Sequence, residues 1–138
     1  MFCGAIALAQ APIKSESRTE TLDFSYAFPA EAAAIPALRK RLDADLTKTK
    51  AEAERYAREG RALARREKRP FNEHYLHKGW MLLGQSDRLM SLVATSDSFT
   101  GGAHGNSRFD FILWDKRAGR AGGPGDLFRS VSLLAEAL

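Results

Sequence analysis

The sequence predicts an α+β fold in which one long helix packs on an antiparallel β-sheet, a meander of about four strands. Three observations support this prediction: an alternating strand pattern near the N-terminus, a long helical pattern after it, and strand patterns joined by turn residues in the second half. The chain has 138 residues, of which 44% are hydrophobic, so it can bury one core and a single domain is expected.

The first strand is predicted at residues 22–28, LDFSYAF. A large apolar residue occupies every second position, and this period of two indicates a half-buried strand. Pro29 then ends the pattern.

A helix is predicted from Pro36 to Lys68, about 50 Å long at 1.5 Å per residue. Pro36 suits a first helical turn, and Gly60 is the position at which the helix could break or bend. Apolar or small residues recur in steps of three or four and form one stripe: Leu38, Leu42, Leu46, Thr49, Ala53, Tyr56, Gly60 and Leu63.

The other face of this helix is basic. Residues 36–70 contain 12 Lys or Arg and 6 Asp or Glu, so the net charge of +4 comes from this segment. Clustered cations can neutralise phosphates, but no base-stacking aromatic platform and no DNA-reading helix motif accompanies them. The acidic residues are interleaved, so we expect a solvated amphipathic helix and no nucleic-acid function; anionic envelope polymers or phospholipid stay open as partners.

Strand patterns return after Pro70. FNEHYLHKGWMLLG (71–84) and RLMSLVATSDSF (88–99) are expected to pair as a hairpin through the turn QSD. RFDFILWD (108–115) is the next strand, and Gly119 supplies a positive φ in the turn that follows. GGPGDLF is too rich in glycine for a strong strand, and the residues after it read as the start of a helix.

Residues 1–18 read as the remnant of an apolar leader and a linker. The run Phe2 to Leu8 is followed by small residues at Ala9 and Ala11, which fit an A-x-A cleavage site; a frayed apolar N-terminus is the alternative. We expect an exported protein, periplasmic or tethered to the envelope, whose start lies inside a longer leader. No run of about eighteen apolar residues exists, so no membrane span is expected within the chain.

One motif resembles a known family. TGGAHGN (100–106), followed by a strand with Asp110, a turn with Gly119 and then DLF (126–128), resembles the extracytoplasmic domain of unknown function that precedes the catalytic domain of PdaC-type peptidoglycan deacetylases. The same domain type occurs in RsiV-type, lysozyme-sensing anti-sigma factors and in envelope lipoproteins. The resemblance implies a domain over 19–128 and a second domain after it, of which 129–138 would be the truncated first helix. Residues 121–125 depart from the family pattern, and no deacetylase activity is transferred.

The glycine-rich loop has two interpretations. Gly101, Gly102 and Gly105 allow a nest of N–H groups that could hold an anion or a carbonyl, although nucleotide-binding spacings are absent. We interpret His104 as a buried histidine that satisfies loop carbonyls, which makes the loop a latch between two strands. The alternative is a hydrolase in which His104 acts with Asp97 or Asp110. Asn106 completes the candidate binding loop.

Two other sets of residues are candidates for a site. His74, His77, His104 and Glu73 could bind a metal, but positions 74 and 77 of a strand face opposite sides, and Cys3 is the only cysteine, so we expect no metal. Trp80 and Trp114 belong either to the core or to an exposed face that stacks on sugar rings.

Together these observations predict a non-catalytic extracytoplasmic interaction or accessory module of the cell envelope. Its expected partner is cell-wall glycan, such as peptidoglycan, or a protein ligand such as lysozyme, and no cofactor is expected. The candidate binding residues are Gly101, Gly102, His104, Gly105, Asn106, Trp80 and Trp114.

Overall fold

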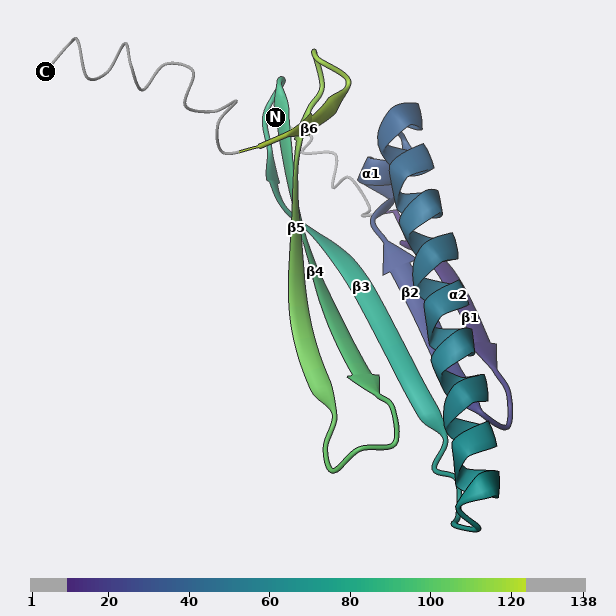
Figure 1. Ribbon diagram of the computed structural model, residues 1–138. Coiled ribbons are helices and arrows are strands. Elements are labelled where there is room, and N and C mark those ends of the chain that lie inside the picture. Colours follow the sequence, from purple (N-terminus) through teal and green to yellow (C-terminus); the bar gives the residue numbers. More distant parts are fainter. Residues whose placement is uncertain (1–9, 124–138) are drawn as a thin grey trace, which may run out of the picture.

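The computed structural model describes residues 10–123, which form one β-sheet and a long helix that covers part of one face (Figure 1). Residues 1–9 of the leader and linker predicted at 1–18, the DLF motif at 126–128 and the helix predicted at 129–138 lie outside the described residues. The elements are β1 (Ile13–Arg18), β2 (Leu22–Phe28), α1 (Ala30–Ala33), α2 (Pro36–Arg66), β3 (His74–Gln85), β4 (Leu89–Phe99), β5 (Asn106–Asp115) and β6 (Arg120–Gly122).

The sheet corrects the predicted fold class. The described residues form six strands in the order β1-β2-β3-β4-β5-β6, and the sheet is mixed instead of an antiparallel meander of four. β2 and β3 pair in parallel because α2 connects them and returns the chain to the same end of the sheet, whereas the other neighbours are antiparallel. The α+β class itself holds, with one long helix on the sheet.

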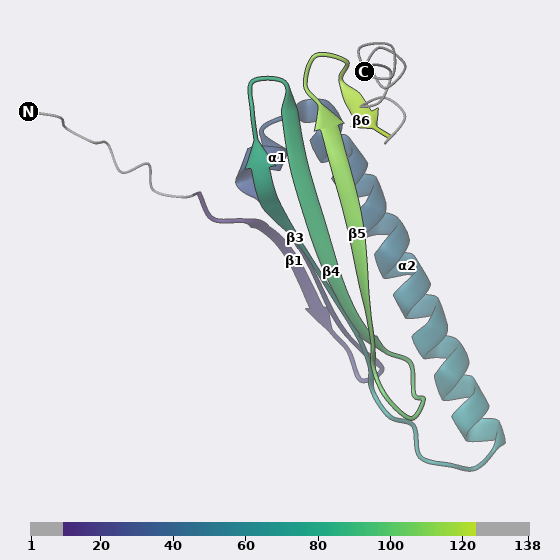
Figure 2. The same ribbon diagram turned by 90° about the vertical axis from the view of Figure 1, so that its left-hand side faces the viewer.

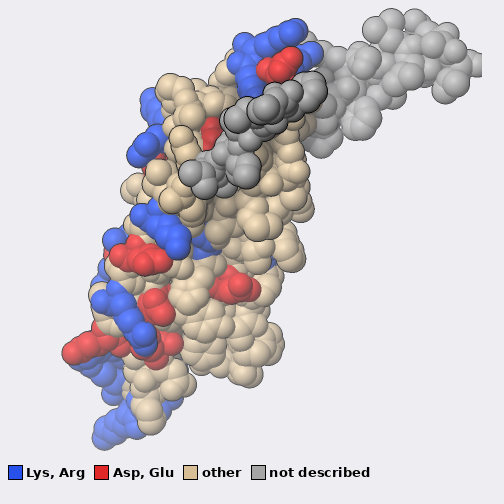
Figure 3. All heavy atoms as spheres, turned by 180° about the vertical axis from the view of Figure 1, so that it is seen from behind, with Lys and Arg blue, Asp and Glu red and all other residues tan. Residues whose placement is uncertain are grey.

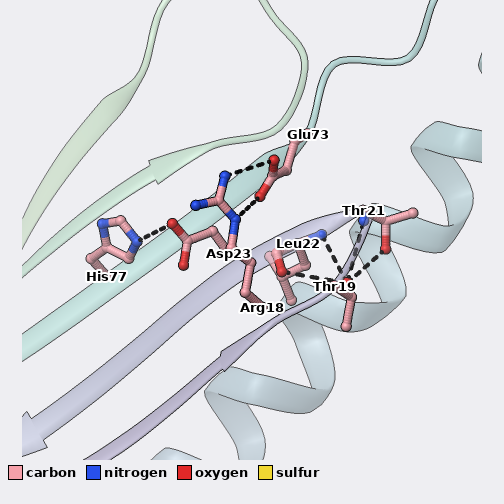
Figure 4. A network of polar contacts seen from close by, with 7 residues as sticks. All are labelled: Arg18, Thr19, Thr21, Leu22, Asp23, Glu73 and His77. Carbon is pink, nitrogen blue, oxygen red and sulfur yellow. Dashed lines mark hydrogen bonds and ion pairs between the residues drawn. The ribbon is translucent and has the colours of Figure 1, made fainter.

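β1 is one of the two strands that were not predicted. It falls in the segment interpreted above as linker, because IKSESR has no apolar alternation. It pairs with β2 along its whole length, from Ile13 opposite Phe28 to Arg18 opposite Asp23. The tight turn between them is closed by Thr19, whose N–H donates to the carbonyl of Leu22 at 2.9 Å and whose Oγ1 accepts from the N–H of Leu22 at 3.1 Å (Figure 4).

On the face away from α2, ion pairs join β1, β2 and β3. Arg18 of β1 contacts Glu73, just before β3, with 3.0 Å between Nε and Oε1. Asp23 of β2 lies 3.4 Å from Nε2 of His77 on β3. Figure 4 shows both pairs lying side by side next to the β1–β2 turn. All four side chains are substantially exposed, so these pairs contribute little to stability.

Several predicted elements are confirmed. β2 has the predicted bounds, β3 and β4 form the predicted hairpin, and Gly119 has a φ of 65° in the turn after β5. β5 begins at Asn106, two residues before the predicted start. The other unpredicted strand, β6, has three residues and pairs only with the end of β5.

α2 has 31 residues, begins at Pro36 and runs through Gly60 without a break. The predicted apolar stripe is correct in the first half of the helix and wrong in the second, where Tyr56 and Leu63 are exposed. In the second half, the buried stripe lies one residue beyond the predicted one, at Ala57 and Ala64 instead of Tyr56 and Leu63. A step of four residues is closer to the helical period of about 3.6 than the predicted step of three. The buried residues of α2 are Leu38, Leu42, Ala53, Ala57 and Ala64.

The core lies between α2 and one end of the sheet. α2 packs mainly on β2, with a smaller contact on β3 (Figure 1). The fully buried large side chains are Phe24, Tyr26, Phe28, Leu38, Leu42, Met90 and Leu92. Because α2 covers β2 instead of the middle of the sheet, parts of β3, β4 and β5 on the helix side remain open.

Candidate ligand-binding groove

A groove with a volume of about 520 Å³ lies between α2 and the uncovered part of β3, β4 and β5. We call it the α2 groove. Its lining is mostly polar and comes from both walls. From α2 come Arg41, Leu42, Asp45, Lys48, Thr49 and Glu52, and from the sheet come Leu76, Lys78, Trp80, Ser96, Ser98, Asn106, Arg108, Asp110, Phe111 and Ile112.

Lys78 lies at the bottom of the α2 groove, with only 7% of the residue exposed. Its Nζ is 2.8 Å from Oδ2 of Asp45 on α2 and 3.0 Å from Oδ2 of Asp110 on β5. A buried ammonium group is costly unless it is paired, and here two carboxylates pair with it. Lys78 therefore ties the helix to two strands of the sheet and fixes the floor of the groove.

Tyr26 and Trp80 extend this cluster into the core. The hydroxyl of Tyr26 donates to Oδ2 of Asp45 at 2.5 Å and accepts from Nε1 of Trp80 at 2.8 Å. Nζ of Lys78 also lies 5.1 Å from the ring centroid of Trp80, within the range of a cation–π contact. Burial, together with the hydrogen bond to Asp45, raises the pKa of Tyr26, so its hydroxyl keeps its proton.

Asp110 is shared between the floor and the rim of the groove. Burial alone would raise the pKa of its carboxyl, but the hydrogen bond and charge of Lys78, with those of Arg108, outweigh burial and lower it. Nη2 of Arg108 is 3.0 Å from Oδ1 of Asp110. The carboxylate is therefore ionised and held between two cations, which leaves it unsuited to act as a general base.

Arg41 and Lys48 form the cationic rim on the helix side. Both are exposed, and neither forms an ion pair within residues 10–123. Elsewhere on α2, basic residues are paired along the helix, for example Arg55 with Glu59 and Arg39 with Asp43. Figure 3 shows this interleaving of Lys and Arg with Asp and Glu on the side where α2 lies.

The structure corrects the interpretation of His104. The residue is exposed, and the only polar contact of its ring among the described residues joins Nδ1 to the carbonyl oxygen of Gly105 at 2.9 Å. It is therefore not a buried latch. Its sequence neighbours Gly101, Gly102 and Asn106 are exposed as well, although Asn106 lines the end of the α2 groove.

The loop is held against the sheet by its glycines. A Cβ on Gly105 would lie 2.6 Å from the hydroxyl of Tyr75 and 3.2 Å from the carbonyl oxygen of Ser98, so a side chain at this position would displace the hydroxyl and crowd the strand backbone. Gly101 has a φ of 85°, which favours glycine, whereas a Cβ on Gly102 would meet nothing within 4 Å. The close approach to β3 is thus made by backbone rather than by the imidazole of His104.

The buried histidine is His74, with 3% of the residue exposed. Its ring lies against Phe71, with centroids 5.2 Å apart, and next to Gly60 of α2 and Gly101 of the loop. Burial lowers the pKa of His74, and Nδ1 has no hydrogen-bond partner within residues 10–123. His74, and not His104, is therefore the buried histidine near the loop, and it packs between the helix, the sheet and the loop.

The carboxylates of the hydrolase alternative lie on opposite faces of the sheet. Asp97 is on the outer face and accepts a hydrogen bond from Oγ of Ser107 at 2.5 Å. Asp110 is on the α2 face with Lys78. Within the part of the chain that the structure describes, neither makes a polar contact with His104.

The other candidate residues lie apart. Trp80 and Trp114 are both buried, so the exposed pair for sugar stacking is wrong. His74 faces α2 and His77 faces the outer side, as the parity of a strand predicts, and residues 10–123 contain no cluster of three or more His, Cys, Asp or Glu that could hold a metal. No described helix combines the length and the apolar character that a membrane crossing needs.

The described residues form a small α+β domain with a polar groove between its helix and its sheet. A family model described as deacetylase PdaC matches residues 15–107, and the chain belongs to this family. The match includes the glycine-rich loop and confirms the resemblance that TGGAHGN indicated. It fits an extracytoplasmic accessory domain.

Two solved structures are similar to the chain in fold. A DUF3298 family protein from Pseudomonas aeruginosa PAO1 is 18% identical with a TM-score of 0.55, and the similarity covers 93% of this chain and 67% of that one. A DUF3298 family member from Bacteroides fragilis NCTC 9343 is 15% identical with a TM-score of 0.56, covering 84% and 59%. This chain thus spans about two thirds or less of these neighbours. No curated protein matches it.

Proposed function

We propose that the chain is a non-catalytic interaction module of the bacterial cell envelope that binds cell-wall glycan in the α2 groove. The observation that carries this proposal is the lining of the groove, where hydroxyl, amide, carboxylate and cationic groups surround the fixed cluster at Lys78. Sugar hydroxyls both donate and accept hydrogen bonds, so they need such a mixed set of partners. A floor whose side chains already hold one another loses little entropy when a ligand binds.

The rim adds a preference for ligands that carry carboxylates. Arg41 and Lys48 are exposed at the groove and have no ion-pair partner among the described residues. Peptidoglycan contains carboxylates along its length, so charge attraction would strengthen its binding at low salt. Leu76 supplies apolar surface beside the polar groups, against which the face of a sugar ring can pack.

The hydrolase alternative has weaker support. A general base needs a reacting group within hydrogen-bond reach and a partner that orients it. His104 is exposed on its loop and contacts a backbone carbonyl, while Asp97 and Asp110 are engaged by Ser107 and Lys78. Export to the periplasm or the outer surface follows the family and is part of the same proposal.

The test is retention of the purified protein on insoluble peptidoglycan at low and at high salt. The variant Arg41→Ala/Lys48→Ala removes the rim cations, and Lys40→Ala/Arg58→Ala removes the same charge from exposed positions of α2 outside the groove. We expect salt-sensitive retention of the wild type and of the control, and a loss of roughly tenfold for the rim variant. Absence of retention at low salt would overturn the proposal, and equal losses in both variants would replace the groove with unspecific charge attraction.

A further inference from the structure

One long strand of the sheet, β5, has a neighbour on only one side over most of its length. β5 pairs with β4 along the whole length of β5, whereas β6 pairs only with Leu113 to Asp115. Within the described residues, β5 from Asn106 to Ile112 therefore has a free side, which we call the β5 edge. Figure 2 shows β5 at the side of the sheet, with only β6 beyond its upper end.

The register shows which backbone groups point outward at the β5 edge. The N–H of Lys116 donates to the carbonyl of Arg88 at 2.7 Å, which directs residue 116 toward β4, and the carbonyl of Asp115 accepts from Gly119 on the β6 side at 2.9 Å. β4 and β5 pair without a bulge, so this alternation continues along the strand. Ser107, Phe109 and Phe111 thus direct their N–H and C=O groups to the free side.

Two of these three residues, Phe109 and Phe111, expose apolar side chains. Phe109 and Phe111 are 62% and 71% exposed, and both project from the face of the sheet that is turned away from α2. Proteins usually protect a free strand edge with charges or proline. The opposite edge follows this rule, since β1 carries Lys14, Glu16 and Arg18 at alternate positions. The β5 edge has phenylalanine at the equivalent face.

We propose that the β5 edge accepts an extended polypeptide segment of a partner protein, which adds to the sheet as an antiparallel strand beside Ser107 to Phe111. Edge strands with free backbone groups recognise peptides in this way. This inference does not depend on glycan binding, because the hydrogen bonds that hold the segment come from the backbone of the edge.

The geometry also specifies the chemistry of the partner segment. In an antiparallel pair, residues that exchange hydrogen bonds have their side chains on the same face. The bonded residues of the segment would therefore lie beside Phe109 and Phe111 and should be apolar. The intervening residues would face the α2 groove, where Arg41 and Lys48 favour acidic side chains. The segment should thus alternate apolar and acidic residues.

Three synthetic peptides test this inference by titration calorimetry at constant salt. The first alternates valine and glutamate over the length of the β5 edge, the second is N-methylated on its valines and the third on its glutamates. N-methylation of the valines removes the N–H groups that would bond to β5, whereas the glutamate N–H groups point away. We expect the first and third to bind alike and the second roughly tenfold or more weakly. Equal effects of both methylations, a greater effect at the glutamates, or no binding of the unmodified peptide would overturn the inference.

Two variants test the domain side. Phe109→Ala removes the aromatic ring and keeps the N–H, whereas Phe109→Pro removes both at an edge position that tolerates proline. We expect proline to weaken binding of the unmodified peptide roughly fivefold beyond alanine. Circular dichroism checks that both variants are folded. If Phe109→Pro unfolds the domain, the experiment with the methylated peptides on the wild-type protein still tests the inference. Retention on peptidoglycan is measured on the same proteins. If the wild-type protein is retained but does not bind the peptide, only the edge proposal fails. If it binds the peptide but is not retained, only the glycan proposal fails.

Discussion

The imidazole of His74 lies next to Gly60 of α2, and its atoms Cε1 and Nε2 are 2.9 Å from the place that a Cβ on Gly60 would take. A glycine in the interior of a helix usually costs stability and suggests a bend, yet α2 is continuous here. The reason for this glycine is therefore tertiary packing. Because Gly60 has no side chain, the ring of His74 on β3 can lie close to the backbone of α2.

The first prediction concerns this contact. Alanine at position 60 gains about 1 kcal/mol in helix propensity, but it overlaps a buried ring, and overpacking costs about 1–3 kcal/mol. We expect Gly60→Ala to lower the free energy of unfolding in urea by about 1 kcal/mol. The same substitution in a His74→Ala background should raise it instead. Stabilisation by Gly60→Ala alone would show that the ring moves away without cost.

The second prediction compares two glycines of the TGGAHGN loop. Gly105→Ala places a Cβ 2.6 Å from the hydroxyl of Tyr75 and 3.2 Å from the backbone of Ser98, so we expect a loss of about 1–2 kcal/mol in thermal or urea unfolding. Gly102→Ala is the matched control, because its Cβ would meet nothing within 4 Å. Similar stabilities of the two variants would contradict the close approach of the loop to β3.

The third prediction tests the cluster on the floor of the groove. Lys78→Met keeps the length of the side chain but leaves the carboxylates of Asp45 and Asp110 without their shared cation. We expect a loss of about 2 kcal/mol, less than for a completely buried pair because both carboxylates are partly exposed. Lys40→Met on the exposed side of α2 should change stability by less than about 0.5 kcal/mol. Equal effects would show that Lys78 contributes no more than a surface lysine.

The fourth prediction is a pH dependence. Burial lowers the pKa of His74 below its ordinary value of 6.5, so the unfolded state binds this proton more readily than the folded state. The contribution of His74 to stability is therefore complete above pH 6.5 and is lost as the pH falls from there through the folded pKa. His74→Gln cannot titrate, so its free energy of unfolding should fall less steeply between about pH 7 and 5. Parallel curves for the two proteins would contradict this, since the other histidines contribute equally to both.

Local patterns were sufficient to predict the elements that bury one face. The alternation in LDFSYAF predicted β2 correctly because its four large apolar residues all reach the core, and glycine at position 119 predicted the turn in which this residue has a positive φ. β1 was missed because an edge strand that is mostly exposed needs no apolar alternation. The parallel pairing of β2 and β3 depends on where α2 crosses the sheet, which no local pattern records.

The site could be predicted only in part, because long-range contacts build it. Lys78 shares the parity of Leu76 and Trp80 on β3, and this was the one signal that it faces the core. Its partners Asp45 and Asp110 are more than thirty residues away on either side of it in the sequence. The loop motif directed attention to His104, although the tertiary contacts bury His74. His104 is next to Gly105 in the sequence, whereas His74 is next to Gly60 and Gly101 only in the folded structure. The sequence therefore could not show which of the two rings is buried.

The central claim is that glycan binds between α2 and the sheet. The most direct measurement is a map of backbone amide chemical shifts while soluble peptidoglycan fragments are titrated into the protein. Binding in the α2 groove should move the signals of Ser96, Ser98, Asn106 and Arg108 together with those near Arg41 and Lys48. Shifts confined to other surfaces, or none at all, would contradict the claim.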